Sequence, residues 1–350
     1  MQNSNSSSIQ PSPEGILKIG MGFWASKVLL TAVQLQLFTI LAKEGKQSAS
    51  QLYARFQFKC STRNCFDFLD TLVSLGFLHR DGLLSTAQYS NGPDVEVFLD
   101  KNKPSYIGGI LEMANNRLYK FWGDLEDGLR TGKAQNEMKH GGNDLFAEIY
   151  KEPKRLAEFV HGMSGIQMGN FMAFPQKFDF SNYKTLTDVG GAGAMLSIMV
   201  AKHQPNMACT SFDLPPVEPI AQANINQFQL CAKVKTKSGD FFNDELPKAD
   251  VVEMGNILHY WNEEKKLVLM KKAYDALPSG GAFVAIENVI DDERKQNTFG
   301  MLMSLNMLIE TEEGFDYTFA DFNGWAKKAG FTKTALIPLT GPTSAAVAYK

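Results

Sequence analysis

The sequence predicts an α/β protein in which a doubly wound, mostly parallel sheet follows a smaller helical domain. From Lys184 to about residue 290, short apolar segments of strand length alternate with segments of helix length, which is typical of a parallel sheet with crossover helices. Glycines follow the first strand and an aspartate ends the second, as in Rossmann-like sheets that bind nucleotide-like ligands. Residues 15–102 instead show helical periodicity and one hairpin signal.

Composition narrows the possible functions. The 350 residues suffice for two domains, and the formal net charge of -3 favours neither nucleic acid nor an anionic membrane surface as a partner. The four cysteines form no Cys-x-x-Cys pair and no cluster with metal-ligand spacing, so we expect reduced thiols, a cytoplasmic protein and no metal. Charge or glycine interrupts the apolar runs before the ~20 residues that a membrane span needs, so we expect no span.

Four segments are expected along the chain. Residues 1–14 are polar and predict a disordered tail. Residues 15–102 predict a winged-helix-like dimerisation domain, residues 103–180 a helical linker that contributes to a substrate pocket, and residues 181–350 the ligand-binding catalytic domain.

The N-terminal domain begins with an unusually apolar helical pattern between Gly15 and Leu41. Because apolar residues occupy most of its circumference, we expect burial on more than one side, which suggests a partner subunit. Ser48 and Ser61 are N-cap signals for two further helices, and Gly76 ends the second of them. Residues 77–80 and 83–85 predict two short strands around an Asp-Gly turn.

Three helices and a hairpin form a winged-helix arrangement, which often binds DNA. The expected recognition helix carries Arg63 together with Asp67 and Asp70, and Arg80 of the hairpin is followed by Asp81. A DNA-binding surface needs a basic stripe, and this pattern provides none. A dimerisation and substrate-lid domain is therefore favoured over a DNA-binding regulator.

The catalytic domain is predicted to contain five parallel strands and a closing hairpin antiparallel to the rest. The strands are Thr185–Val189, Ala208–Phe212, Lys233–Lys237, Asp250–Met254 and Ala282–Ile286, and the hairpin consists of Thr332–Pro338 and Ala345–Tyr349.

Ligands of such sheets bind beyond the carboxyl ends of the strands. The residues at those ends are the glycine turn at Gly190, Asp213, Asp240 with Phe241, His259 and Glu287. A histidine at this edge is suited to removing a proton near neutral pH, and a carboxylate from the neighbouring strand end would contact its Nδ1–H. The alternative is a structural histidine whose hydrogen bonds are satisfied.

Methionine and aromatic residues gather in the linker and near residue 303, and they suit the wall of a pocket for a flat aromatic ligand. Core packing is the alternative for each of them. The residues expected to line the pocket are Met113, Asn116, Phe146, Met163, Gln167, Asn170, Tyr260, Trp261, Met303, Asn306 and Met307.

The ordered motifs resemble those of the S-adenosylmethionine-dependent small-molecule O-methyltransferases, which include plant caffeate and flavonoid enzymes, hydroxyindole O-methyltransferases and bacterial natural-product enzymes. The resemblance covers about residues 15–350. It rests on Asp188-Val-Gly-Gly, Phe212-Asp-Leu-Pro, Gly239-Asp-Phe-Phe, Ile257-Leu-His-x-Trp, Leu277-Pro-x-Gly-Gly, Glu287 and Glu312-Glu-Gly-Phe-Asp-Tyr-Thr.

The resemblance implies a homodimeric enzyme of secondary metabolism that transfers a methyl group to the hydroxyl of a small, aromatic molecule. It also implies that His259 is the general base and that Glu287 and Asp316 flank it. It implies S-adenosylmethionine as cofactor, S-adenosylhomocysteine as product, and no metal. The implied cofactor-binding residues are Asp188, Gly190, Gly191, Asp213, Leu214, Asp240, Phe241 and Asn256.

Three positions depart from the family pattern. Ala194 stands where a third glycine is usual, Tyr260 where aspartate follows the catalytic histidine, and Asp316 where glutamate is common. Alanine does not readily adopt a positive φ and adds a methyl group near the ligand path. The first two departures therefore leave open weaker cofactor binding, an altered substrate, or a methyltransferase fold that catalyses rearrangement, cyclisation or hydroxylation. Methylation of carbon or nitrogen also stays open, because the geometry of the pocket selects the acceptor atom.

Overall fold

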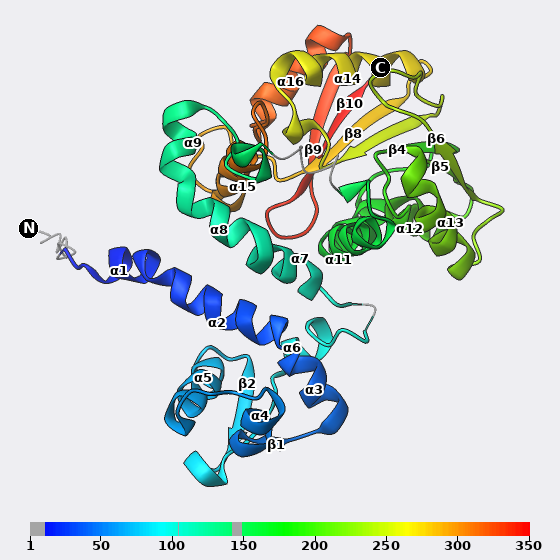
Figure 1. The fold of residues 1–350 in the computed structure, drawn as a ribbon. Helices are drawn as coiled ribbons and strands as arrows, with labels where there is room; N and C mark the ends of the chain where they lie inside the picture. Colours follow the sequence, from blue (N-terminus) through cyan, green and yellow to red (C-terminus); the bar gives the residue numbers. More distant parts are fainter. Residues whose placement is uncertain (1–10, 104, 142–148) are drawn as a thin grey trace, which may run out of the picture. The chain divides into compact units, whose positions relative to one another are not determined.

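The computed structural model describes residues 11–103, 105–141 and 149–350 (Figure 1). The chain divides into two compact units, the first ending at Asn116 and the second beginning at Arg117.

The first unit packs helices against a small antiparallel sheet with strand order β1-β3-β2. The side chains of Ser48 and Ser61 accept hydrogen bonds from the amides of Gln51 and Asn64, so both predicted N-caps are confirmed. The elements are α1 (Glu14–Gly20), α2 (Gly22–Gln34), α3 (Leu37–Glu44), β1 (Gln47–Ser48), α4 (Ala49–Arg55), α5 (Thr62–Ser74), β2 (Leu78–Asp81), η1 (Leu84–Thr86), β3 (Gln88–Asn91), α6 (Pro93–Phe98) and α7 (Gly108–Met113).

The second strand of the hairpin lies later in the sequence than predicted. Residues 84–86 form a 3-10 turn instead of a strand. Leu84 has a φ of 47°, and the Thr86 hydroxyl donates to the carbonyl of Leu83 at 2.8 Å and accepts from its amide at 3.2 Å. This closed turn occupies the predicted strand, so pairing begins where Gln88 lies opposite Asp81.

Helices α1 and α2 leave large apolar side chains exposed. Ile16, Ile19 and Trp24 are 77%, 81% and 61% exposed, and α1 buries no residue within the single chain. By length and composition alone, Glu14–Gln34 is long and apolar enough to cross a membrane. The expectation that every apolar run falls short of a span is therefore wrong for this segment.

The second unit contains a seven-stranded sheet with the order β6-β5-β4-β7-β8-β10-β9. The five predicted parallel strands are confirmed, each within about one residue of its expected ends. The strands are β4 (Thr185–Val189), β5 (Ala208–Asp213), β6 (Val234–Ser238), β7 (Val251–Gly255), β8 (Ala282–Glu287), β9 (Lys333–Pro338) and β10 (Ser344–Tyr349).

The closing hairpin is also confirmed, with one correction to its direction. Strand β10 runs antiparallel to β8, but β9 runs antiparallel to β10 and hence parallel to the main strands. Because the turn between β9 and β10 reverses the chain, only β10 runs antiparallel to the five main strands.

Helices cover both faces of this sheet (Figure 1). Two apolar cores result, one beneath α11, α12 and α13 and one beneath α14 and α16. The helical elements of this unit are η2 (Ala114–Leu118, a π-helical turn at the boundary), α8 (Tyr119–Phe121), η3 (Trp122–Asp124), α9 (Leu125–Thr131), η4 (Glu137–His140), α11 (Pro153–Lys177), α12 (Met195–His203), η5 (Pro215–Val217), α13 (Glu218–Gln227), η6 (Leu258–Tyr260), α14 (Glu263–Ala276), α15 (Thr298–Glu310) and α16 (Phe319–Ala329).

Candidate active site

The turn after β4 requires glycine at two positions. Gly190 has a φ of 73°, in the left-handed region that glycine adopts without steric cost. A Cβ at Gly191 would collide with the Ser211 hydroxyl and lie 2.9 Å from Cγ of Asp188. The turn is thus a close-fitting backbone cradle. Ala194, which stands where a third glycine is usual, also has a positive φ, of 59°, which an alanine adopts only with strain.

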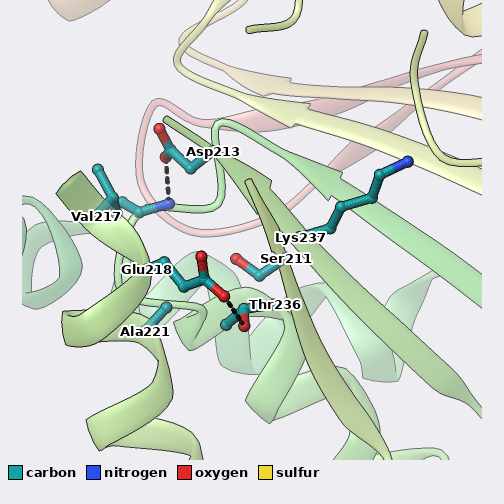
Figure 2. A pocket seen from close by; sticks show the side chains of 8 residues that line it. Ser211, Asp213, Val217, Glu218, Ala221, Thr236 and Lys237 are labelled. Atoms are coloured by element: carbon teal, nitrogen blue, oxygen red, sulfur yellow. Dashed lines mark hydrogen bonds between the residues drawn. The ribbon is translucent and has the colours of Figure 1, made fainter. Parts of the chain in front are cut away.

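Asp213 ends β5 beside this turn. One of its carboxylate oxygens accepts from the amide of Ala192 at 2.9 Å, and the other accepts from the amide of Leu214 at 2.7 Å. Burial raises the pKa of Asp213, although these two amides oppose the shift. Figure 2 shows the carboxylate at a small pocket, with the Lys237 side chain directed away from it. The pocket is lined by Ala192, Ser211, Asp213, Val217, Glu218, Ala221, Thr236 and Lys237.

The loop after β6 holds Asp240 and Phe241 in a tight turn. The two carboxylate oxygens of Asp240 accept from the amide of Phe242 at 2.8 Å and from the side chain of Asn243 at 2.6 Å. Phe242 stands edge-on to Trp261, with ring centroids 4.8 Å apart. An acceptor and an aromatic wall therefore lie together at this edge of the sheet.

The loop after β7 brings His259 into contact with two carboxylates. Nδ1 of His259 lies 3.4 Å from Oδ1 of Asp316, and both side chains are almost completely buried. Oε1 of Glu287 accepts from the backbone amide of His259 at 3.2 Å. The carboxylate that faces Nδ1 is therefore that of Asp316, whereas the sequence suggested Glu287. The reason is that Glu287 ends β8 beneath the backbone of the histidine turn.

The electrostatic surroundings favour a basic imidazole. Burial alone would lower the pKa of His259, but the carboxylates of Asp316 and Glu287 outweigh burial and raise it. Both ring nitrogens of His259 are buried and neither has a hydrogen-bond partner among the described residues, but Nδ1 faces the Asp316 carboxylate at 3.4 Å. With Nδ1 directed at Asp316, Nε2 is the nitrogen left to accept a proton.

Lys266 contacts the two backbone segments that carry His259 and Asp316. Its Nζ donates to the carbonyls of Trp261 at 2.6 Å and Phe315 at 2.9 Å, and it lies 3.2 Å from the centroid of the Phe315 ring. Burial lowers its pKa to about 8. Sequence reasoning missed Lys266, because the acidic and basic run that opens α14 is typical of a solvated helix face.

A buried pair of carboxyls lies beneath the glycine turn. Asp188 on β4 pairs in register with Glu253 on β7. Asp188 accepts from the Ser197 hydroxyl at 2.9 Å, and its pKa is raised to about 6, chiefly by burial. Burial and the Asp188 charge raise the pKa of Glu253 well above its ordinary value, which favours the protonated form of Glu253 in the folded protein. Glu253 was not anticipated, because it stands in an otherwise apolar strand.

The expected pocket residues fall on several elements. Met303, Asn306 and Met307 lie on α15, where Asn306 accepts from Nε1 of Trp122 at 2.9 Å. Tyr260 stands edge-on to His259, with ring centroids 4.7 Å apart.

Other expected pocket residues have different surroundings. Met163, Gln167 and Asn170 lie on α11, and Asn170 is occupied by hydrogen bonds to Gln167 and Thr340. Met113 and Asn116 belong to the first unit, so their contribution stays a prediction. Phe146 lies outside the described residues.

Among residues 11–103, 105–141 and 149–350, no group of three or more His, Cys, Asp or Glu side chains is arranged to hold a metal ion.

Comparison with known proteins covers both units. Residues 122–332 match the model of the O-methyltransferase domain, and residues 17–101 match that of the O-methyltransferase dimerisation domain. The chain is 35% identical to the tetracenomycin polyketide synthesis 8-O-methyl transferase TcmO of Streptomyces glaucescens, over 97% of both chains. It is 29% identical to the acetylserotonin O-methyltransferase of Gallus gallus, over 91% of this chain and 92% of that protein. The crystal structure of human N-acetylserotonin methyltransferase with S-adenosylmethionine aligns with a TM-score of 0.88 at 27% identity, over 99% of both chains.

Proposed function

Because the chain belongs to the S-adenosylmethionine-dependent O-methyltransferases of small molecules, we propose that it methylates a hydroxyl of an aromatic compound with His259 as the general base. The observation that carries this proposal is the buried imidazole with Asp316 at Nδ1 and no described partner at Nε2. TcmO and acetylserotonin O-methyltransferase, by their names, act on a polyketide and on a hydroxyindole derivative, which supports an aromatic acceptor.

The residues at the strand ends suit the cofactor. Glycine at positions 190 and 191 lets the turn pack closely on Ile257, Ser211 and Asp188, where any Cβ would collide. Beside this turn, Asp213 would offer carboxylate oxygens to ribose hydroxyls. Phe241 and Asp240 would flank the adenine. The bound cofactor supplies an electrophilic methyl group on a sulfonium.

The chain's own contribution is to position the acceptor and remove its proton. Nε2 of His259 accepts the hydroxyl proton while Asp316 holds the ring and stabilises the imidazolium that forms. The Glu287 carboxylate holds the backbone of His259 by accepting a hydrogen bond from the His259 amide. Positioning and deprotonation of the acceptor suffice for catalysis, because methyl transfer needs only a nucleophilic oxygen in line with the methyl group at close range.

We propose further that the chain is a homodimer formed through the first unit. The match to the dimerisation domain and the exposed apolar side chains of α1 and α2 support this assembly. A second copy that covers these helices would remove large apolar groups from water.

His259→Ala tests the catalytic proposal. Titration calorimetry with S-adenosylmethionine should give nearly the same affinity for the variant as for the natural protein, whereas turnover of a phenolic acceptor should fall by about 10²–10⁴-fold. Undiminished turnover would remove His259 as the base. Mass spectrometry of the product would distinguish an oxygen acceptor from nitrogen or carbon.

A further inference from the structure

A second group of charged side chains lies beside the histidine cluster. Nε and Nη2 of Arg117 donate to the two carboxylate oxygens of Glu137 at 2.7 and 2.6 Å, and Nη2 also donates to Oε2 of Glu310 at 3.1 Å. The Arg117 and Glu310 side chains are only 12% and 5% exposed. The group joins η2, η4 and the last turn of α15, and the mechanism above does not use it.

The pairing within this group is incomplete. Nη1 of Arg117 and Oε1 of Glu310 are both buried without a hydrogen-bond partner among the described residues. Leaving a buried donor or acceptor unpaired is costly, and a charged group raises that cost. One open donor and one open acceptor thus remain on two residues that are themselves hydrogen-bonded to each other.

Tyr260 links this group to the proposed base. The charges of Glu310, Asp316 and Arg117 all act on the Tyr260 phenol, whose ring also contacts that of His259. Asn306, one turn before Glu310 on α15, holds the indole of Trp122. Arg117 and Glu310 therefore lie close enough to act on the Tyr260 ring beside His259, and they belong to η2 and α15 rather than to the strand ends that carry Gly190 and Asp213.

The charge balance indicates which ligand would complete the group. Two carboxylates face one guanidinium, so the group has a net charge of about -1 when all three are ionised. A carboxylate on the ligand would be repelled by Glu310 and Glu137. A neutral ligand with a carbonyl beside a hydroxyl would satisfy both open atoms, whereas a lone hydroxyl would satisfy only one.

We propose that Arg117 and Glu310 form a recognition subsite for a neutral aromatic hydroxy-ketone, with Nη1 donating to the ketone oxygen and Oε1 accepting from the hydroxyl. The subsite rests on the proposed function in one respect, because it requires that the aromatic acceptor lies on the His259 side. Removal of either residue should change which aromatic compound binds without changing cofactor affinity.

Three naphthalene probes of equal ring size test this selectivity. Binding of 1-hydroxy-2-acetonaphthone, 1-naphthol and 1-hydroxy-2-naphthoic acid would be measured by titration calorimetry in saturating S-adenosylhomocysteine. The natural protein should bind the hydroxy-ketone about tenfold or more tightly than either other probe, since a hydrogen bond to a charged group supports a change of that size. Equal binding of all three, or binding of none, would overturn the subsite.

Substitutions of Arg117 and Glu310 test whether these two residues cause the selectivity among the three probes. Arg117→Met should abolish the preference for the hydroxy-ketone over 1-naphthol, and Arg117→Lys, which keeps the charge but not the fork, should restore it only partly. Glu310→Gln should improve binding of the naphthoic acid by about tenfold, because it removes one repelling carboxylate. Probe ratios that stay unchanged in all three variants would refute the proposal.

The controls separate folding and catalysis from recognition. Glu126 and Arg130 form an exposed ion pair on α9, with side chains 77% and 73% exposed, so Arg130→Met and Glu126→Gln should leave all three affinities unchanged. S-adenosylhomocysteine affinity and the thermal transition report whether each variant is folded. Failure of the proposed function would instead appear as loss of cofactor binding or as unchanged turnover in His259→Ala.

Discussion

Nδ1 of His259 lies 3.4 Å from Oδ1 of Asp316, although the two residues are 57 positions apart in the sequence. The contact joins the turn after β7 to the segment after α15. In the proposed mechanism this contact orients the imidazole and places a carboxylate next to the imidazolium that would form.

Asp316→Asn should shift the pH dependence of turnover. The imidazole acts as a base only when neutral, and Asp316 raises the pKa of His259, so activity is lost as the pH falls through that raised pKa. The variant should therefore lose about tenfold or more in kcat, and the acidic limb of its kcat/KM profile should move to lower pH. An acidic limb at the same pH as in the natural protein would contradict the contact.

Lys266→Met should impair turnover without weakening cofactor binding. The substitution keeps an apolar stem but removes both hydrogen bonds, to the carbonyls of Trp261 and Phe315. Because Asp316 directly follows Phe315, its distance from the imidazole should become less well fixed, and kcat should fall about tenfold. Lys271→Met, at an exposed position on the same helix, provides the matched control. Equal kcat values for the two variants would exclude a positioning role.

Glu253→Leu should stabilise the protein, most strongly at alkaline pH. The folded state holds Glu253 protonated, whereas the unfolded chain releases that proton above the ordinary pKa of 4.5, so the free energy of unfolding falls as pH rises. At about pH 8 the variant should gain about 1–3 kcal/mol by denaturant titration, and less at about pH 5. Glu264→Leu, at an exposed position, should give no such pH-dependent gain. A gain that is the same at both pH values would rule out the retained proton.

Ala194→Gly should relieve strain at the start of α12. Ala194 has a φ of 59°, a region that costs an alanine free energy and costs glycine little. We expect a net stabilisation of about 0.5–1 kcal/mol, because the glycine also makes the unfolded chain more flexible. Calorimetric titration of S-adenosylmethionine into both proteins would show whether the methyl group also weakens cofactor binding. A lower midpoint of unfolding for the glycine variant would contradict the strain.

Ile19→Asp should convert the proposed dimer to monomers. Ile19 is 81% exposed in the single chain, and a charge there would be buried unpaired if a second copy covered α1. Sedimentation velocity should show roughly half the mass for the variant. Leu83→Asp, at a 65% exposed position in the hairpin turn of the same unit, should leave the mass unchanged. A natural protein that sediments as a monomer would refute the dimer.

The sequence predicted the elements of the catalytic unit well, because their signals are local. Alternation of strands and helices, the glycine turn and the acid ending β5 all depend on residues close in the chain. The hairpin of the first unit was misplaced for an equally local reason. The Thr86 hydroxyl closes a turn on Leu83, and hydrophobic residues alone do not reveal such a turn.

The missed parts of the site are contacts between distant residues. Arg117 and Glu310 are 193 positions apart, and no motif around either residue indicates that the two side chains form a hydrogen bond. Glu253 and Asp188 meet only because β4 and β7 are adjacent in the sheet. Choosing between Glu287 and Asp316 as the partner of Nδ1 likewise requires the path of the backbone around His259.

The place of β10 between β8 and β9 has a consequence for how the chain folds during synthesis. Strand β9 leaves the ribosome first, yet its pairing partner in the sheet is β10, which is translated afterwards. The five parallel strands can assemble as they emerge, but β9 and the free edge of β8 stay without their β10 partner until β10 has been synthesised. The nascent chain is therefore most exposed to edge-to-edge association late in translation, while β8 and β9 both lack their shared neighbour.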